Sequence, residues 1–264
     1  MGASSFNSSR LVGFLSGLQP GAPSAAAPAG KATPTLAEQL GAWMGWTDAI
    51  ALSSVLNAPV ATPAAPAAAT PAHNAAWRTL APTLARLRSE LAAAVAADPV
   101  LAPRLDGTAA PAAPAAQRPR VGAPPPARRP ALLLTLAEAA DPALYRRSYL
   151  AHQRTMALRA EPLRAQVRAA MARLSPALAQ LATLDATLEK ALAARERQCL
   201  ASVPVLLERF FDRQRQAAAP LDEAATTLPD WLAQYRQLVQ AVLLAEWEVR
   251  LLPTEGLIEA LRAG

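Results

Sequence analysis

Residues 141–176 read DPALYRRSYLAHQRTMALRAEPLRAQVRAAMARLSP and indicate an all-α fold. The segment opens with Asp141 before Pro142, a capping residue followed by a first-turn proline. In that position the missing amide of proline costs nothing and its fixed φ suits a helix. Ser175-Pro176 repeats the arrangement at the other end. The sequence therefore predicts one helix over residues 142–174 and a second helix that begins directly after it.

The first of these helices carries a heptad pattern. Its seam residues alternate in steps of four and three and are Tyr149, Gln153, Met156, Ala160, Leu163, Val167, Ala170 and Leu174. Such a seam is typical of helices that pack along their length. Pro162 is the only internal residue of this helix that disfavours helical backbone.

Two further amphipathic helices are expected after Ser175. The apolar side of the second helix is predicted to contain Leu181, Leu184, Leu188, Leu192, Cys199, Val203, Leu206 and Phe210. The third begins near Pro229, and its stripe is Trp231, Tyr235, Leu238, Val242, Ala245, Val249 and Leu252. Pro253 is expected to end it, with a last helical turn from Glu255 to Arg262. Because the connection at Ser175 is short, we predict long amphipathic helices in an antiparallel helical bundle or coiled coil.

Proline divides the chain unevenly, since 18 of its 25 prolines precede residue 131. Pro/Ala-rich stretches cannot form a regular hydrogen-bond ladder and behave as extended linkers. We therefore predict an N-terminal region of short helices and Pro/Ala-rich linkers at residues 1–101, a disordered basic linker at 102–130, and a C-terminal helical bundle at 131–264.

Four helices are expected in the N-terminal region. They span Ser8 to Leu18, a segment from Leu36 capped by Thr35, a segment capped by Thr47 or Asp48, and Ala75 to Ala97. The second and third of these form a small predicted hairpin. The fourth carries Leu80, Leu84, Leu87, Leu91 and Val95 at helical spacing, with Pro82 at a start or kink.

The helix at residues 142–175 is strongly basic, and this is the one feature of the sequence that suggests a function. It has seven arginines against Glu161, whereas residues 176–264 carry nine Lys/Arg against twelve Asp/Glu. The arginines could pair with acidic helices or a partner, follow the phosphates of a nucleic acid, or remain solvated. The candidate interaction surface comprises Arg146, Arg147, Arg154, Arg164, Arg168, Trp231, Tyr235, Leu238 and Val242.

Sites for catalysis, metals or cofactors are not expected. The chain has one cysteine and two histidines, too few for a transition-metal cluster, and no nucleotide-binding or hydrolase motif. Cys199 is expected to pack inertly on an apolar helix face. Glu246 and Glu248 are not expected to form an acid/base pair, because residues two apart diverge on a helix; both are expected to be ordinary solvated charges.

A reducing compartment suits a chain with a single cysteine, so we expect a cytoplasmic protein. No apolar run reaches the length of about 18 residues that a membrane span requires. The longest candidate, Leu238 to Leu252, is interrupted by polar and charged side chains.

Several segments carry a family resemblance. They are Ala42-Trp-Met-Gly-Trp-Thr-Asp-Ala-Ile50, Tyr149-Leu-Ala-His-Gln-Arg154, Leu184-Asp-Ala186, Ala194-Arg-Glu196 and Leu206-Leu-Glu-Arg-Phe210. The chain resembles an uncharacterised bacterial protein family of unknown function, over most of its length except the Pro/Ala linkers. The resemblance brings no catalytic residues. We therefore expect a non-enzymatic helical scaffold or adaptor that forms a homo-oligomer or binds a helical partner, with nucleic-acid binding as the alternative.

Overall fold

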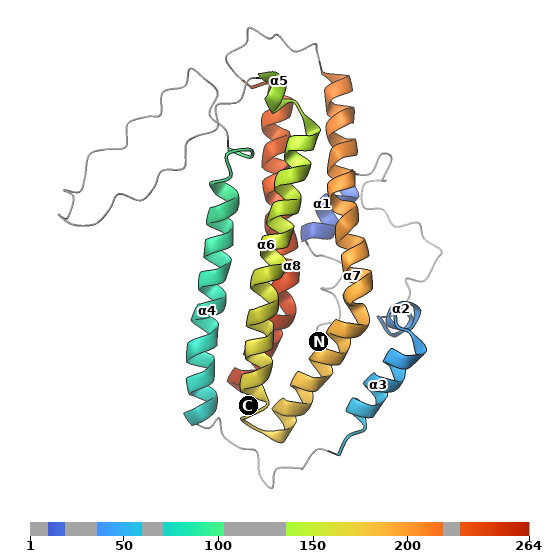
Figure 1. The fold of residues 1–264 in the computed structure, drawn as a ribbon, viewed down its shortest axis with the longest axis vertical. Helices are drawn as coiled ribbons and strands as arrows, with labels where there is room; N and C mark the ends of the chain where they lie inside the picture. Colours follow the sequence, from blue (N-terminus) through green and yellow to red (C-terminus); the bar gives the residue numbers. More distant parts are fainter. Residues whose placement is uncertain (1–9, 19–35, 60–70, 103–135, 219–227, 264) are drawn as a thin grey trace, which may run out of the picture.

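The computed structural model describes residues 10–18, 36–59, 71–102, 136–218 and 228–263 (Figure 1). Every regular element in these ranges is a helix, which confirms the predicted all-α fold. The helices are α1 (Arg10–Leu18), α2 (Leu36–Trp43), α3 (Trp46–Leu56), α4 (Pro71–Ala96), α5 (Leu136–Ala139), α6 (Pro142–Met171), α7 (Pro176–Ala217) and α8 (Asp230–Ala263).

Four long helices, α4, α6, α7 and α8, form the body of the molecule (Figure 1). Helices α6 and α7 are antiparallel partners joined by the turn at residues 172–175. Helix α4 runs antiparallel to α6, since Asp98 contacts Ser148 while Glu90 pairs with Arg159. Helix α8 lies against α4, α6 and α7, so it is the central helix of an antiparallel helical bundle.

Capping fixes the starts of α6 and α7 as the sequence predicts. The Asp141 carboxylate accepts a hydrogen bond of 2.9 Å from the Ala143 amide, and the Ser175 hydroxyl accepts one of 3.2 Å from the Leu178 amide. Each bond satisfies an amide that the first helical turn leaves without a backbone partner.

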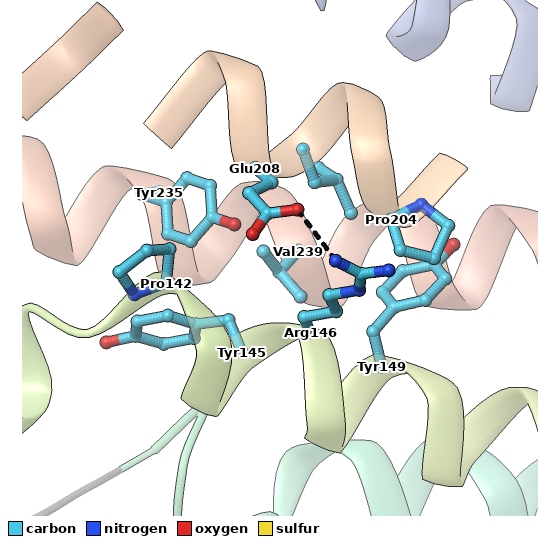
Figure 2. A pocket seen from close by; sticks show the side chains of 9 residues that line it. Pro142, Tyr145, Arg146, Tyr149, Pro204, Glu208, Tyr235 and Val239 are labelled. Carbon is cyan, nitrogen blue, oxygen red and sulfur yellow. Dashed lines mark hydrogen bonds and ion pairs between the residues drawn. The ribbon is translucent and has the colours of Figure 1, made fainter. Parts of the chain in front are cut away.

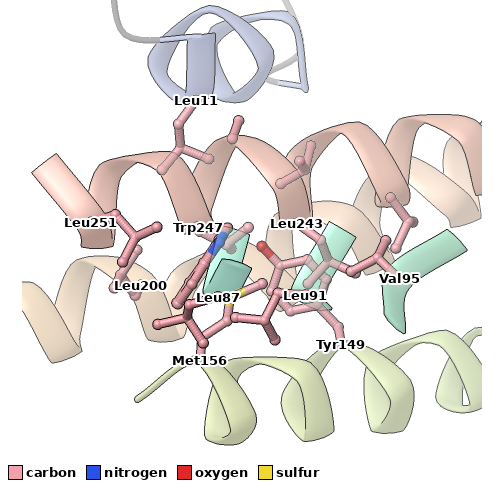
Figure 3. Close-up of a cluster of buried hydrophobic side chains, with 14 of the residues drawn as sticks. Leu11, Leu87, Leu91, Val95, Tyr149, Met156, Leu200, Leu243, Trp247 and Leu251 are labelled. Atoms are coloured by element: carbon pink, nitrogen blue, oxygen red, sulfur yellow. The ribbon is translucent and has the colours of Figure 1, made fainter. Parts of the chain in front are cut away.

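The core is shared between the N-terminal and C-terminal regions (Figure 3). The predicted α4 stripe is fully confirmed, because its five apolar residues are all buried. Within the predicted α6 seam, Tyr149, Met156, Leu163 and Val167 are buried, and the other members are partly buried. Helix α1 adds Leu11 and Leu18. Helices α1 and α4 therefore complete the core that α6, α7 and α8 begin.

The apolar stripe predicted for the second half of α7 is confirmed at Val203, which is buried, but its centre is displaced by one residue elsewhere. The other fully buried side chains are Leu200, Leu207 and Phe211, whereas Leu206 and Phe210 are partly buried and Cys199 is exposed. Cys199 is exposed, so its expected packing is also wrong. The sequence permits either side because apolar residues occur in adjacent pairs there. Aromatic partners on α6 and α8 select Phe211, whose ring lies 4.9 Å from that of Tyr235.

Helix α8 continues through Pro253 to Ala263, so the predicted end at Pro253 is wrong. Pro253 is exposed, so its ring does not displace any side chain of the core, although the helix loses one backbone hydrogen bond there. Continuing the helix buries Leu257, Ile258 and Leu261, which offsets the cost of the proline. The expected seam residue Leu252 is exposed, and Leu251 is buried in its place.

Helices α2 and α3 form where the sequence predicts them, but they share hardly any contacts, so they do not pack as the closed hairpin that was expected. The cap of α3 is Gly45 instead of Thr47 or Asp48. We call residues 36–59 the hairpin. The Asp48 carboxylate accepts a hydrogen bond of 3.3 Å from the Gly45 amide and so stabilises the start of α3. The expected cap Thr35 and residues 103–130 of the expected basic linker lie outside the described residues.

Candidate functional site

The apolar residues on α8 that the sequence offered as an interaction surface contribute to the core of the chain itself. Tyr235 and Val242 are buried. Trp231 and Leu238 are half-buried and pack against the core. This stripe therefore packs against other helices of the same chain.

Tyr235 packs within a cluster of aromatic side chains (Figure 2). Its ring meets that of Tyr145 edge-on at 5.2 Å, and Phe211 contacts both tyrosines. The hollow beside this cluster measures about 10 Å³, room for one water molecule at most. It cannot hold a substrate.

Three of the five candidate arginines on α6 pair with carboxylates on α7. Arg146 lies 3.2 Å from Glu208, the ion pair drawn in Figure 2. Arg164 lies 2.5 Å from Asp185, and both Arg164 and Arg168 contact Glu189. Burial lowers the pKa of Arg164, but the carboxylates of Asp185 and Glu189 outweigh it, so the net pKa is raised. These arginines thus join two helices of opposite charge.

The other two candidate arginines, Arg147 and Arg154, are exposed on α6. The paired arginines Arg164 and Arg168 line a cleft of about 450 Å³ between α6, α7 and α8, together with Arg250. All three guanidinium groups already contact carboxylates. Arg197 also lines the cleft, is exposed and has no ion pair among the described residues, but the carboxylates of Glu161, Glu189 and Glu196 share the lining.

Glu246 is fully buried, with 0% exposure, so its expected solvation is wrong. Its carboxylate accepts hydrogen bonds from the Tyr149 hydroxyl at 2.7 Å, the Gln153 amide at 2.9 Å and Arg250 Nε at 2.9 Å. A buried carboxylate is tolerated only with such partners. Burial raises the pKa of the Tyr149 hydroxyl, and the adjacent Glu246 carboxylate raises it further.

The spacing of Glu246 from apolar residues earlier in α8 indicates burial. Glu246 follows Leu232 and Val239 at intervals of seven, so it occupies the same heptad position as two buried residues. Arg236 lies seven residues before the buried Leu243 in the same way and is itself buried, where its Nε donates to the Tyr145 hydroxyl at 2.8 Å. Heptad phase indicated burial at both positions, whereas residue type suggested exposure.

A second polar cluster joins the end of α4 to α6. Asp98 Oδ2 contacts the Ser148 hydroxyl at 2.5 Å and His152 Nε2 at 2.7 Å. The Ser148 hydroxyl and the His152 ring both contact the same carboxylate oxygen of Asp98. In a nucleophilic triad the imidazole lies between the serine and the carboxylate, whereas here the carboxylate lies between the serine and the imidazole. The cluster fastens two helices and does not resemble a hydrolase site.

This cluster predicts a pH-dependent contribution to stability. Burial raises the pKa of Asp98, but hydrogen bonds from His152, Ser148 and the Val100 amide outweigh it, so the net pKa lies below the ordinary value of 3.8. The contribution is therefore present above pH 4 and lost as the pH falls through the folded-state pKa. We expect Asp98→Asn to lower the free energy of unfolding by about 1.5–3 kcal/mol at pH 7.

Urea titrations of both proteins at pH 7 and at pH 3 measure this difference. The difference in the free energy of unfolding between wild type and Asp98→Asn should be smaller at pH 3 than at pH 7. A difference of equal size at both pH values would show that the carboxylate charge is not what stabilises the contact.

In the described residues, exposed large apolar side chains gather mainly on the α2–α3 hairpin; the others, Val12, Leu158 and Leu252, lie singly on α1, α6 and α8. Four large apolar side chains are exposed there, with exposures of 43% for Trp43, 82% for Trp46, 54% for Ile50 and 59% for Leu56. None of the residues of α3 is buried. Clustered exposed apolar residues mark interaction sites more often than scattered ones do. We refer to these four residues as the hairpin surface.

The hairpin contacts the bundle through α7. Gln180 Nε2 donates to the Val55 carbonyl at 2.8 Å, and the Arg195 guanidinium lies 5.7 Å from the centre of the Trp43 ring. A groove of about 370 Å³ also lies on the hairpin, with apolar and small polar walls. Its lining residues are Gly41, Met44, Ala49, Leu52, Ser53, Leu56 and Asn57.

In the described ranges, no three His, Cys, Asp or Glu side chains come together in a way that could hold a metal ion. No helix in these ranges has the length and apolar character needed to cross a membrane.

Comparison with known proteins gives a family and no activity. No curated protein and no solved structure matches the chain. The family described as "Protein of unknown function (DUF3348)" matches residues 2–263, nearly the whole chain, and confirms the resemblance to an uncharacterised family. The chain therefore belongs to the DUF3348 family of proteins of unknown function.

Proposed function

We propose that this protein is a non-enzymatic helical scaffold or adaptor that binds a helical protein partner. The observation that carries the proposal is the hairpin surface, where two tryptophans, an isoleucine and a leucine remain exposed on two adjacent helices. Amphipathic helices commonly dock on apolar surfaces of this kind, and tryptophan is enriched among the residues that dominate binding energy. The cytoplasm is the proposed compartment, consistent with the single, exposed Cys199.

Binding of nucleic acid, the alternative proposal, has weaker support. Phosphate binding requires Lys and Arg side chains that are free to contact phosphates. Arg146, Arg164 and Arg168 contact carboxylates instead, which leaves Arg147 and Arg154 as the exposed candidates on α6. Two exposed arginines on one helix provide little positive charge for binding the phosphates of a nucleic acid.

The experiment that tests the adaptor proposal compares three purified baits, the wild type and two variants. Tagged full-length Trp46→Ser should recover a native partner with affinity reduced about 30-fold or more, since truncating a central aromatic residue typically costs 2 kcal/mol or more. Leu158→Ser is the matched control, because Leu158 is 73% exposed but lies on α6, away from the hairpin. Quantitative mass spectrometry of proteins other than the bait gives the readout. Equal recovery by Trp46→Ser and wild type would contradict a role for the hairpin surface.

A further inference from the structure

The cleft of about 450 Å³ between α6, α7 and α8 lies where the middle of α7 leaves the bundle. Residues 194–199 of α7 are all exposed, and six consecutive residues cover more than one full helical turn. No face of α7 is therefore buried along this stretch. On one side of it α7 returns to α6 through the Arg164–Asp185 ion pair, and on the other through a hydrogen bond of 3.1 Å from Gln153 to the Leu200 carbonyl.

Alanine side chains leave the space between the helices unfilled. Ala157 and Ala160 of α6 and Ala193 of α7 line the cleft, and their single methyl groups do not reach across it. The volume of about 450 Å³ falls within the range of about 300–1,000 Å³ found for pockets that hold small organic ligands. The cleft therefore has room for a small molecule.

Two charged groups of opposite sign line the cleft without forming an ion pair. Arg197 of α7 and Glu161 of α6 are both exposed, and neither pairs with the other or with any other described residue. Both can thus give their charge to a ligand. A molecule that carries one negative and one positive group can contact both side chains.

Arg250 is already positioned for the negative group of such a ligand. Its Nε and Nη2 each lie 2.9 Å from the carboxylate of the buried Glu246, which fixes the guanidinium in the wall of the cleft. Its Nη1 lies 3.7 Å from Glu196, too far for a hydrogen bond, and so remains available as a donor. A donor that is fixed before binding loses little conformational entropy when the ligand arrives.

A buried hydroxyl without a partner also borders the cleft. Thr254 is 1% exposed, and its hydroxyl has no hydrogen-bond partner among the described residues. A buried polar group in this state lowers stability until it gains a partner. Thr254 lies one turn after Arg250 on α8 and lines the same cleft, so a polar ligand bound there can supply that partner.

The remaining charges of the lining disfavour a ligand of one sign. Glu189 and Glu196 add two carboxylates to that of Glu161, and Arg164 and Arg168 add two guanidinium groups to those of Arg197 and Arg250. A phosphate ion in the cleft would lie near three carboxylates, and a polyamine near four guanidinium groups. A ligand with both charges and no net charge avoids either repulsion.

From these observations we propose that the cleft binds a small zwitterion, such as a free amino acid, whose carboxylate contacts Arg250 and Arg197 and whose ammonium group contacts Glu161. None of the residues that line the cleft belongs to the hairpin. The inference therefore goes beyond the proposed function and does not depend on it.

Isothermal titration calorimetry of the full-length chain with each of the common L-amino acids tests the proposal. We expect at least one of them to bind with a dissociation constant between the micromolar and the low millimolar range. N-acetylation of that amino acid removes its positive charge, and amidation of its carboxyl group removes its negative charge. Each change should weaken binding about tenfold or more, because each breaks a hydrogen bond between charged groups.

Substitutions in the cleft locate the binding site. Arg197→Gln and Glu161→Gln should each weaken binding about tenfold or more. Both side chains are exposed and unpaired among the described residues, so circular dichroism should show unchanged helix content and unfolding temperature. Ala193→Leu fills the cleft and should abolish binding. Arg154→Gln is the matched control and should bind as the wild type does, because Arg154 is exposed on α6 but does not line the cleft.

Three results would each overturn the inference. The first is that no amino acid binds at millimolar concentration. The second is equally tight binding of the N-acetyl or the amide derivative, which would indicate a site for an anion or a cation instead. The third is binding that survives Arg197→Gln, Glu161→Gln and Ala193→Leu, which would place the ligand elsewhere on the chain.

Discussion

Replacing Trp247 with alanine should lower the free energy of unfolding by about 3–5 kcal/mol, the range for truncating a large buried aromatic residue. Trp247 lies on the central helix α8 and is 2% exposed. Figure 3 shows it in the cluster that contains Leu87 and Leu91 of α4 and Met156 of α6. Its removal opens a cavity where three helices meet. Because folded domains are stable by only about 5–15 kcal/mol, this loss is a large part of the total.

Urea unfolding followed by circular dichroism measures the effect, and Trp46→Ala is the matched control. Both substitutions remove an indole, but Trp46 is largely exposed. We expect its replacement to change the free energy of unfolding by less than about 0.5 kcal/mol. Similar losses for the two variants would contradict the central position of Trp247 in the core.

Glu246→Leu should be comparably destabilising, by about 3–5 kcal/mol, because it breaks a buried ionic contact from one side. Tyr149, Gln153 and Arg250 all donate to this carboxylate. Without it the buried Tyr149 hydroxyl has no acceptor, and the guanidinium charge of Arg250 loses its nearest counterion, since Glu196 lies farther away at 3.7 Å. Gln153 keeps its other hydrogen bond, to the Leu200 carbonyl.

A double-mutant cycle separates the lost contact from other effects. Glu246→Leu combined with Arg250→Leu should be less destabilising than the sum of the two single substitutions, since the second removes the uncompensated charge. Glu248→Leu is the control, because Glu248 is exposed two residues away and should tolerate the change. Strict additivity in urea titrations would show that Glu246 and Arg250 do not stabilise each other.

Sequence predicted the parts of the fold that local signals determine. Asp141 and Ser175 marked helix starts because capping depends on a few adjacent residues. The seam of α6 and the stripe of α4 followed from helical periodicity alone. Pro253 misled because its local cost is outweighed by burial of residues further along α8, which is a tertiary effect.

The candidate site was less predictable for the same reason. Several helices carry apolar stripes, and which stripe remains exposed depends on which helices cover one another. The α8 stripe at Tyr235 and Val242 is covered by the chain itself, whereas Trp46 on the hairpin is not. Residue type alone also placed Glu246 at the surface, although its partners Tyr149 and Gln153 lie 97 and 93 residues away in sequence.

Sharing the core between α4 and the C-terminal helices has a thermodynamic consequence. Helices α6 and α7 are separated by a short turn and can associate locally, but α4 ends at Ala96 and α6 begins at Pro142. Docking of α4 therefore closes a long loop. Loop-closure entropy grows only logarithmically, by about 0.6 kcal/mol for each doubling of length. The connection between α4 and α6 can thus be lengthened at little energetic cost, so insertions between residues 103 and 135 should change the stability of the bundle far less than substitutions in the α4 stripe.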